Sequence, residues 1–247
     1  MRLSRNIVGV LAVVGALAVA CTDIVTDGDR LAGSGDTVSE TRPVGEFERI
    51  TLAGEGAVLF AAGSDGQIEV ETDDNIMAHI ETGISGDTLT ISTEPDVDID
   101  PSDGVVYRLG CPELTGVVMT GAGTIDVADC TSSDQLELEL AGAGTIVATD
   151  VDVSMLDVSL PGAGSIVTDG VVDRLDLVVA GAGDFAGEDL RATEADIESL
   201  GVGVISVWVT DELDIRLTGA GVFRYYGEPV VTQTISGVGM VESLGPR

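Results

Sequence analysis

The stretch LAGAGTI, from Leu140 to Ile146, decides the fold. A Gly-x-Gly that follows an apolar strand is also how a nucleotide-binding loop begins. A cofactor loop occurs once per domain, however, whereas this motif returns about every 20 residues, as a structural repeat does. The related stretches are AGEGAV (53–58), TGAGTI (120–125), PGAGSI (161–166), AGAGDF (180–185), LGVGVI (200–205), TGAGVF (218–223) and SGVGMV (236–241). Because no copy completes G-x-G-x-x-G, we expect no nucleotide site.

Each repeat alternates apolar and polar residues. The positions two, four and six places before the first glycine, and the position four places after it, are mostly apolar, which is typical of strands with one buried side. Units of this length are short for a four-stranded propeller blade and fit one rung of a parallel β-helix. We therefore predict an all-β fold built as a parallel β-helix. The glycines would form its tight corners, with the small residue between them packed inside.

The composition excludes several kinds of site. The formal net charge is −32, the sequence contains no lysine, and its single histidine is His79. These facts rule out a P-loop lysine, a Schiff-base lysine and a two-histidine zinc site. Nucleic acid is an unsuitable partner, because binding it requires clustered positive charge.

The first 20 residues are typical of a secretory signal peptide. Arg2 and Arg5 precede an apolar stretch, residues 7–20, that is short for a membrane span. Ala18–Cys21 resembles a lipobox, which predicts that Cys21 carries a lipid anchoring the exported protein in the cell envelope. The same residues also fit an Ala-x-Ala cleaved by ordinary signal peptidase, so that alternative stays open.

The rest of the chain divides into a tether and a repeat domain. Residues 21–42 are polar and rich in Gly, Ser, Thr and Asp, which predicts a flexible tether. We expect the β-helix to occupy residues 43–247, with irregular first coils over 43–110 and regular repeats over 111–247. A small separate β cap is the alternative for 43–110.

Two cysteines lie one rung apart in this scheme. Cys111 and Cys130 are separated by 19 residues, so they should stack as neighbours within reach of a disulfide. An exported protein is in a compartment where such a bond persists. We therefore expect a disulfide, with two free thiols as the alternative.

Four stretches, taken in order, resemble the family described as putative auto-transporter adhesin, head GIN domain. They are GEFERITLAGEGAVLF, DDNIMAHIETGISGDTLTIS, the repeated L-x-L-x-GAG-x-I units and the late YYGEPVV. The resemblance covers residues from about Pro43 to Arg247. It implies a right-handed β-helix on a secreted or lipid-anchored bacterial protein, and it supplies no catalytic residues.

One outward position of the repeat is acidic in five successive rungs. It lies five places before the first glycine and holds Glu137, Asp157, Asp176, Asp196 and Asp214. Stacked like charges destabilise paired strands unless pKa values rise, salt screens the charges or cations bind. We expect no cofactor; if the column bound cations, its oxygen ligands would suit Ca²⁺. The alternative to a cation ladder is a solvated acidic face.

An aromatic patch lies near the end of the repeats. Trp208 and Tyr226 both follow their glycines by seven places, so they should be neighbours on adjacent rungs. With Arg224 and Arg216 they form a candidate patch for a glycan or an envelope protein, since rings beside a guanidinium suit both. The alternative is an aromatic cap over the last coils.

These observations favour a lipid-anchored envelope scaffold or adhesin-like binding module without catalysis. The membrane would be contacted through the N-terminal lipid. The alternative is a carbohydrate-active β-helix enzyme, either a polysaccharide lyase or a hydrolase. Such an enzyme would gather its carboxylates in a cleft, whereas the acids here are spread along the axis.

Overall fold

The computed structural model describes residues 30–61, 66–111, 113–127, 130 and 134–247. These residues form strands joined by turns, with a single 3-10 helix, η1 (Met77–His79), among them. The strands of the N-terminal part are β1 (Arg30–Ala32), β2 (Thr37–Pro43), β3 (Arg49–Leu52), β4 (Glu55–Phe60), β5 (Gln67–Asp73), β6 (Ile80–Ser85), β7 (Thr88–Thr93), β8 (Asp98–Asp100) and β9 (Val106–Leu109). The strands of the repeats are β10 (Gly116–Met119), β11 (Ala122–Asp126), β12 (Gln135–Leu140), β13 (Ala143–Leu160), β14 (Ala163–Val179), β15 (Ala182–Ser199), β16 (Val202–Leu217), β17 (Ala220–Tyr226), β18 (Val230–Ile235) and β19 (Met240–Gly245).

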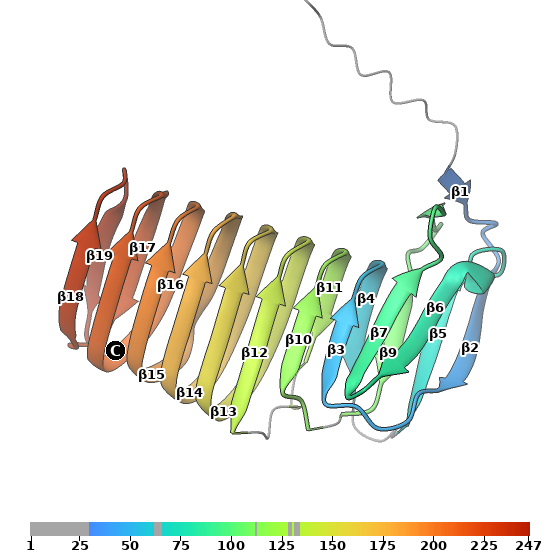
Figure 1. Ribbon diagram of the computed structural model, residues 1–247, viewed down its shortest axis with the longest axis horizontal. Coiled ribbons are helices and arrows are strands. Elements are labelled where there is room, and N and C mark those ends of the chain that lie inside the picture. Colours follow the sequence, from blue (N-terminus) through green and yellow to red (C-terminus); the bar gives the residue numbers. More distant parts are fainter. Residues whose placement is uncertain (1–29, 62–65, 112, 128–129, 131–133) are drawn as a thin grey trace, which may run out of the picture.

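The repeats stack as a parallel β-solenoid (Figure 1). Each strand pairs in parallel with its counterpart about 20 residues away, so that Ala143 pairs with Ala163 and Ala163 with Ala182. β13 to β16 are long strands that run through two sheets, and the register shifts between the two halves of their pairings. We call the sheet that follows each Gly-x-Gly corner the first sheet, and the sheet that precedes the next corner the second sheet. The predicted parallel β-helix is confirmed.

The core lies between the two sheets and consists of columns of identical or similar side chains. The column in the second sheet contains Leu138, Val158, Leu177, Ile197 and Ile215, and the column in the first sheet contains Ile146, Ile166, Phe185, Ile205 and Phe223. All ten side chains are buried. Burying one such side chain contributes about 1.5–3 kcal/mol, so the stacked columns are the main stabilising element of the fold.

The Gly-x-Gly corners stack as closely as the sequence predicted, but one detail is wrong. The residue between the glycines points outward, as the exposed Ala143, Ala163 and Val202 show. The two glycines stack backbone on backbone, and a Cβ on Gly144 would lie 2.0 Å from the carbonyl oxygen of Gly123. The corner therefore turns the residue between the glycines away from the core.

The N-terminal part joins the solenoid out of sequence order. β3 and β4 form its first rung in the chain, and β10 and β11 pair in parallel with them on one side. β7 and β9 pair in parallel with the other side of the same rung. The antiparallel strands β2, β5 and β6 then close that end of the molecule (Figure 1). Residues 43–110 thus supply two rungs and a cap.

The prediction that residues 21–42 form a flexible tether is wrong for the second half of this segment, which forms strands. β2 pairs antiparallel with β5 over seven positions, from Thr37 opposite Asp73 to Pro43 opposite Gln67, and β1 pairs in parallel with β8. Residues 37–43 have mostly exposed side chains, so the backbone pairing left no apolar pattern in the sequence. The predicted signal peptide, Cys21 and residues 22–29 lie outside the described residues.

The predicted disulfide is present. Cys111 and Cys130 are bonded, with their Cα atoms 5.2 Å apart, and Cys130 is buried. The bond ties the segment after β9 to the segment before β12.

In the described part of the chain no helix is long and apolar enough to cross a membrane.

Candidate functional site

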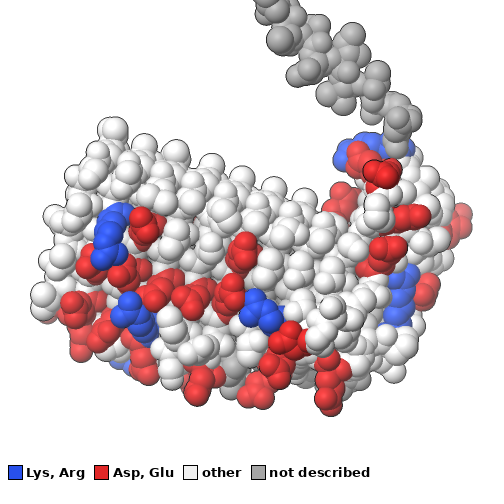
Figure 2. All heavy atoms as spheres, viewed as in Figure 1, with Lys and Arg blue, Asp and Glu red and all other residues white. Residues whose placement is uncertain are grey.

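The acidic column is aligned as the spacing predicted. The register pairs Glu137 with Asp157, Asp157 with Asp176, Asp176 with Asp196 and Asp196 with Asp214. All five side chains project from the outer side of the second sheet, where Figure 2 shows acidic groups across the lower part of the view. The upper edge in that view, along the Gly-x-Gly corners of the later repeats, shows no acidic or basic groups. We call these five residues the acidic column.

Arginines neutralise most of the acidic column, which the sequence reasoning missed. Arg174 pairs with Asp176 at 2.8 Å and with Glu194 at 3.7 Å. Arg216 pairs with Asp196 at 2.6 Å and with Asp214 at 3.3 Å. Arginine side chains from the neighbouring outward positions thus provide the compensation that we expected from salt, cations or raised pKa values.

Glu137 has its own arginine, supplied from across a glycine. Arg49 occupies the same outward position as Gly116 and Glu137, with Gly116 between them. The Arg49 guanidinium crosses Gly116 to reach Glu137 at 2.7 Å. A Cβ on Gly116 would lie 2.6 Å from Arg49 Cζ, so a larger residue at this position would displace the guanidinium from its present path to Glu137.

Asp157 is the member of the acidic column that forms no ion pair among the described residues. Partial burial raises its pKa, and the carboxylates of Asp176 and Glu137 raise it further, against an opposing effect of Arg174. It borders an open hollow of about 430 Å³, which Arg49 and Glu137 also line. Burial first, and the neighbouring carboxylates second, thus disfavour the ionised form of Asp157.

The described side chains do not form a cluster suited to the candidate cation ladder. Among them, no group of three or more His, Cys, Asp or Glu residues is placed to hold a metal ion. The stacked carboxylates face their arginine partners instead. The arrangement is that of a charged, solvated surface.

The aromatic patch is present in a different form from the one predicted. Trp208 and Tyr226 are paired in register on neighbouring rungs of the first sheet, as expected. The guanidinium of Arg247 lies over both rings, 5.5 Å from the Trp208 centroid and 5.2 Å from the Tyr226 centroid. It also donates to the backbone carbonyl of Glu188 and to the Asp189 carboxylate. We call Trp208, Tyr226 and Arg247 the aromatic patch.

The two arginines first assigned to this patch have other partners. Arg224 pairs with Glu242 at 3.4 Å on the same sheet. Arg216 lies in the second sheet, beside the acidic column, because the chain has passed the bend between Trp208 and Leu213. Arg247 follows the last repeat, where periodicity gives no information, so no signal in the sequence pointed to it.

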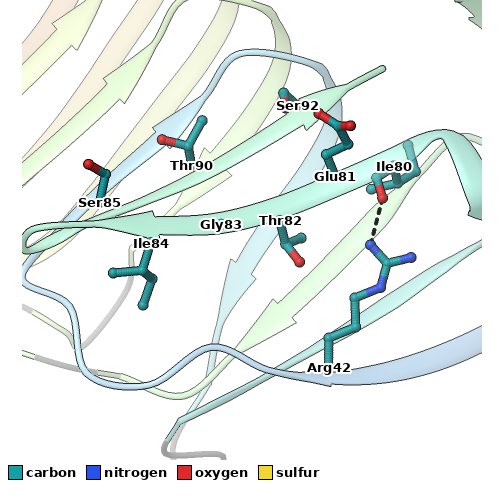
Figure 3. Close-up of a pocket in the computed structure, with 9 residues that line it drawn as sticks. All are labelled: Arg42, Ile80, Glu81, Thr82, Gly83, Ile84, Ser85, Thr90 and Ser92. Atoms are coloured by element: carbon teal, nitrogen blue, oxygen red, sulfur yellow. Dashed lines mark hydrogen bonds between the residues drawn. The ribbon is translucent and has the colours of Figure 1, made fainter. Parts of the chain in front are cut away.

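A second hollow follows the edge strand β6 at the capped end. It measures about 670 Å³ and is open to solvent, with Thr82, Gly83 and Thr90 among its lining residues (Figure 3). Arg42 lies at one end, where its guanidinium donates to the carbonyl oxygens of Ile80 at 2.7 Å and Met77 at 3.1 Å. These bonds fasten β2 to η1 and to the start of β6, and no sequence pattern predicted them.

Comparisons with solved structures agree with this architecture. A putative adhesin from Bacteroides fragilis is 24% identical, with a TM-score of 0.81, and the alignment covers 87% of this chain and 100% of that one. A putative lipid binding protein from Parabacteroides distasonis is 20% identical, with a TM-score of 0.62 over 87% and 100% of the two chains. A putative adhesin from Parabacteroides merdae is 18% identical, with a TM-score of 0.61 over 87% and 99%. At these identities the likeness shows a shared fold.

The comparison with protein families shows which family the chain belongs to. A search of the curated proteins found no relative. Residues 46–229, which include the first rung, β5 and β6 of the cap and most of the repeats, match one family over most of the chain. The chain therefore belongs to the family described as putative auto-transporter adhesin, head GIN domain.

Proposed function

We propose that this protein is an exported binding module, held at the cell envelope by a lipid on Cys21, which recognises a glycan or an envelope protein without catalysis. The family is described as adhesin-like, and solved proteins of the same fold are described as putative adhesins and a putative lipid binding protein. The signal-like N-terminus supports export.

The observation that carries the proposal is the pair of aromatic rings on neighbouring rungs. Trp208 and Tyr226 are half-buried and stand side by side on an outer face. Aromatic rings with a nearby guanidinium and carboxylate combine apolar contact with directed hydrogen bonds, as recognition of sugars and peptides requires. Arg247 and Asp189 supply those two polar groups.

The arrangement of carboxylates argues against the enzyme alternative. A glycoside hydrolase holds two carboxyl groups on either side of the scissile bond. The acidic column lies along one sheet, and four of its five members are held in ion pairs with arginine. A solenoid that presents flat faces at a regular pitch is better suited to binding along its length.

The binding role is tested on a glycan array with the wild type and Trp208→Ala. Loss of an aromatic anchor should weaken binding at least about tenfold. Ser206→Ala, on the same sheet, is the matched control and should bind like the wild type. If the patch is only a cap, Trp208→Ala will lower the melting temperature and leave binding unchanged. Full binding by a folded Trp208→Ala variant would contradict the proposal.

The anchor is tested separately. Cys21→Ser should move the protein from the membrane fraction to the soluble fraction, and a labelled fatty acid should appear on the wild type alone. Cleavage by ordinary signal peptidase predicts no label on either protein. That result would remove the anchor and leave the binding role untouched.

A further inference from the structure

The end of the solenoid formed by β18 and β19 exposes an inward-facing side chain that the preceding repeats bury. Ile235 continues the buried position of Leu217, yet it is 43% exposed, compared with 2% for Leu217. Val230, Val238 and Met240 are 73%, 89% and 56% exposed. We call β18, β19 and the corner between them the end rung. Ile235 is exposed because no described rung packs on it, and Val230, Val238 and Met240 add apolar surface at the outward positions of the same rung.

The backbone of the end rung is also unpaired on one side. In the described part of the chain β18 pairs with β16 alone, and β19 pairs with β17 alone. Figure 1 shows both strands at the open end of the solenoid, opposite the capped end. Free strand edges of this kind present N–H and C=O groups that can pair with another strand.

The end rung is nearly uncharged, in contrast to the rest of the molecule. Residues 230–247 contain one acidic residue, Glu242, in a chain of net charge −32. Arg224 pairs with Glu242 at 3.4 Å. Arg247 lies back over Trp208 and Tyr226, so the segment after β19 is directed along the first sheet and leaves the end rung exposed.

We propose that the end rung is the contact surface for a second copy of this chain, related by a two-fold axis so that two end rungs meet. A second copy carries a strongly acidic surface elsewhere, and its own end rung offers an apolar contact with little charge. It also supplies two strand edges with the same spacing between sheets, so both edges can pair at once. A mismatched partner would satisfy only one of them.

The opposite end does not offer the same contact. It is closed by the antiparallel strands β2, β5 and β6, and β2 carries Glu40 and Arg42. Head-to-tail stacking would bring this polar cap against the apolar end rung and would continue into filaments. Contact between two end rungs closes after two copies. Each molecule would then point its capped end, which carries the N-terminal segment, away from the contact.

The contact is small, which sets the expected strength. β18 and β19 have six residues each, so each spans about 20 Å, and stacked sheets lie about 10 Å apart. An interface of this size is smaller than most specific interfaces, which bury about 1,000 Å² or more in total, so the association is expected to be weak. The dimer should therefore depend on concentration, and screening of the acidic surfaces by salt should strengthen it.

Sedimentation velocity on the Cys21→Ser protein, which lacks the predicted lipid, tests the proposal between about 5 and about 500 µM. The expected result is a monomer that converts to a dimer, with a dissociation constant that falls as NaCl rises from about 50 to about 500 mM. Val230→Asp with Val238→Asp places charges on the end rung and should raise the dissociation constant at least about tenfold.

The matched control adds the same charges at outward positions of rungs away from the end. Val178→Asp with Val202→Asp changes one exposed residue of the second sheet and one at the corner position equivalent to Val238. This variant should dimerise like the parent, and the melting temperatures should show that both variants are folded. A monomer at every concentration, equal weakening in both variants, no weakening in either, or assembly beyond a dimer would each overturn the proposal. None of these outcomes depends on the aromatic patch or on the lipid.

Discussion

Gly142 lies directly over Gly121, so closely that a Cβ on Gly142 would be 1.9 Å from the carbonyl oxygen of Gly121. The same contact recurs between Gly162 and Gly142 and between Gly181 and Gly162. The atom in the way belongs to the backbone, which cannot rotate aside as a side chain does. The repeated glycine is therefore required by the stacking of rungs, and this requirement explains why it returns in every repeat.

Replacement of one stacked glycine should destabilise the protein strongly. Gly142→Ala would separate two rungs, and we expect a loss of at least about 3 kcal/mol, the upper range for overpacking. For a chain of this size the melting temperature should fall by about 6–12 °C. Gly83→Ala is the control, because no atom lies within 4 Å of a Cβ built there. Similar melting temperatures for the two variants would show that the corner relaxes at little cost.

The sequence predicted the parts of the fold that depend on periodicity. Strand alternation and a fixed repeat length place Leu138 over Val158 and stack the acidic column, because parallel rungs of near-equal length must keep register. The direction of Ala143 could not be predicted, since alternation stops at a corner where backbone geometry sets the side-chain direction. β3 lies between β10 and β7 in the solenoid, although β7 comes between them in the chain. This order depends on which long-range pairing is the more stable, and a repeat pattern does not contain that information.

The ion pairs of the acidic column were missed for a related reason. Arg174 lies two residues before Asp176, in a different outward position, so the aligned column showed only acids. Arg49 is in line with the column but far away in the sequence, across the cap. The periodicity places side chains on a face, whereas these partnerships depend on the reach of long arginine side chains across neighbouring positions.

Asp157→Asn should stabilise the protein at neutral pH. The pKa of Asp157 is raised in the folded state, chiefly by burial, so its ionised form opposes folding. The carboxylate is largely exposed, so the gain should be below about 1 kcal/mol, and the rise in melting temperature should be no more than about 2–4 °C. Asp176→Asn is the control, because it removes the partner of Arg174 and should give no gain. A gain from both substitutions would mean that Arg174 does not offset the repulsion.

The advantage of Asp157→Asn should depend on pH in one direction. Unfolded Asp157 ionises near pH 3.9 and folded Asp157 at a higher pH. As the pH rises through this window, the wild type loses stability from this group, whereas the asparagine variant does not. The difference in melting temperature should appear above about pH 4 and level off once the folded carboxylate is ionised. A difference that is constant from acidic to neutral pH would contradict this explanation.

The disulfide should contribute substantially to stability. Cys111 and Cys130 close a loop of 19 residues, for which chain entropy predicts about 3 kcal/mol. Cys111→Ser with Cys130→Ser should lower the melting temperature by about 6–12 °C. Reductant should lower the melting temperature of the wild type to the same value and leave the melting temperature of the double variant unchanged. A wild type that is insensitive to reductant while fully reduced would show that the bond adds no stability.

Asp73 fastens the N-terminal segment to the cap. Its carboxylate accepts hydrogen bonds from the backbone N–H of Gly35 at 2.7 Å and of Ser102 at 2.8 Å, and the side chain is buried. Gly35 lies between β1 and β2, so this single carboxylate joins the segment that leads toward Cys21 to the turn after β8. These N–H donors, that of Ser102 foremost, lower the pKa of Asp73.

Asp73→Asn should release β1 and β2 while the repeats stay folded. The amide group would turn an N–H donor toward one of the two backbone donors, so one bond is lost and a repulsion replaces it. At neutral pH, hydrogen exchange over residues 30–43 should accelerate at least about tenfold. Asp74→Asn is the matched control, because Asp74 accepts from the exposed Ser34 hydroxyl and an amide oxygen can do the same.

The same hydrogen bonds should depend on pH. Because the pKa of Asp73 is lowered on folding, the contribution of Asp73 to stability is complete above the ordinary value near 3.9 and is lost as the pH falls through the lowered value. In acid the wild type should therefore come to exchange like the variant over this segment. Equal protection of residues 30–43 in both variants at neutral pH would show that strand pairing alone holds the segment.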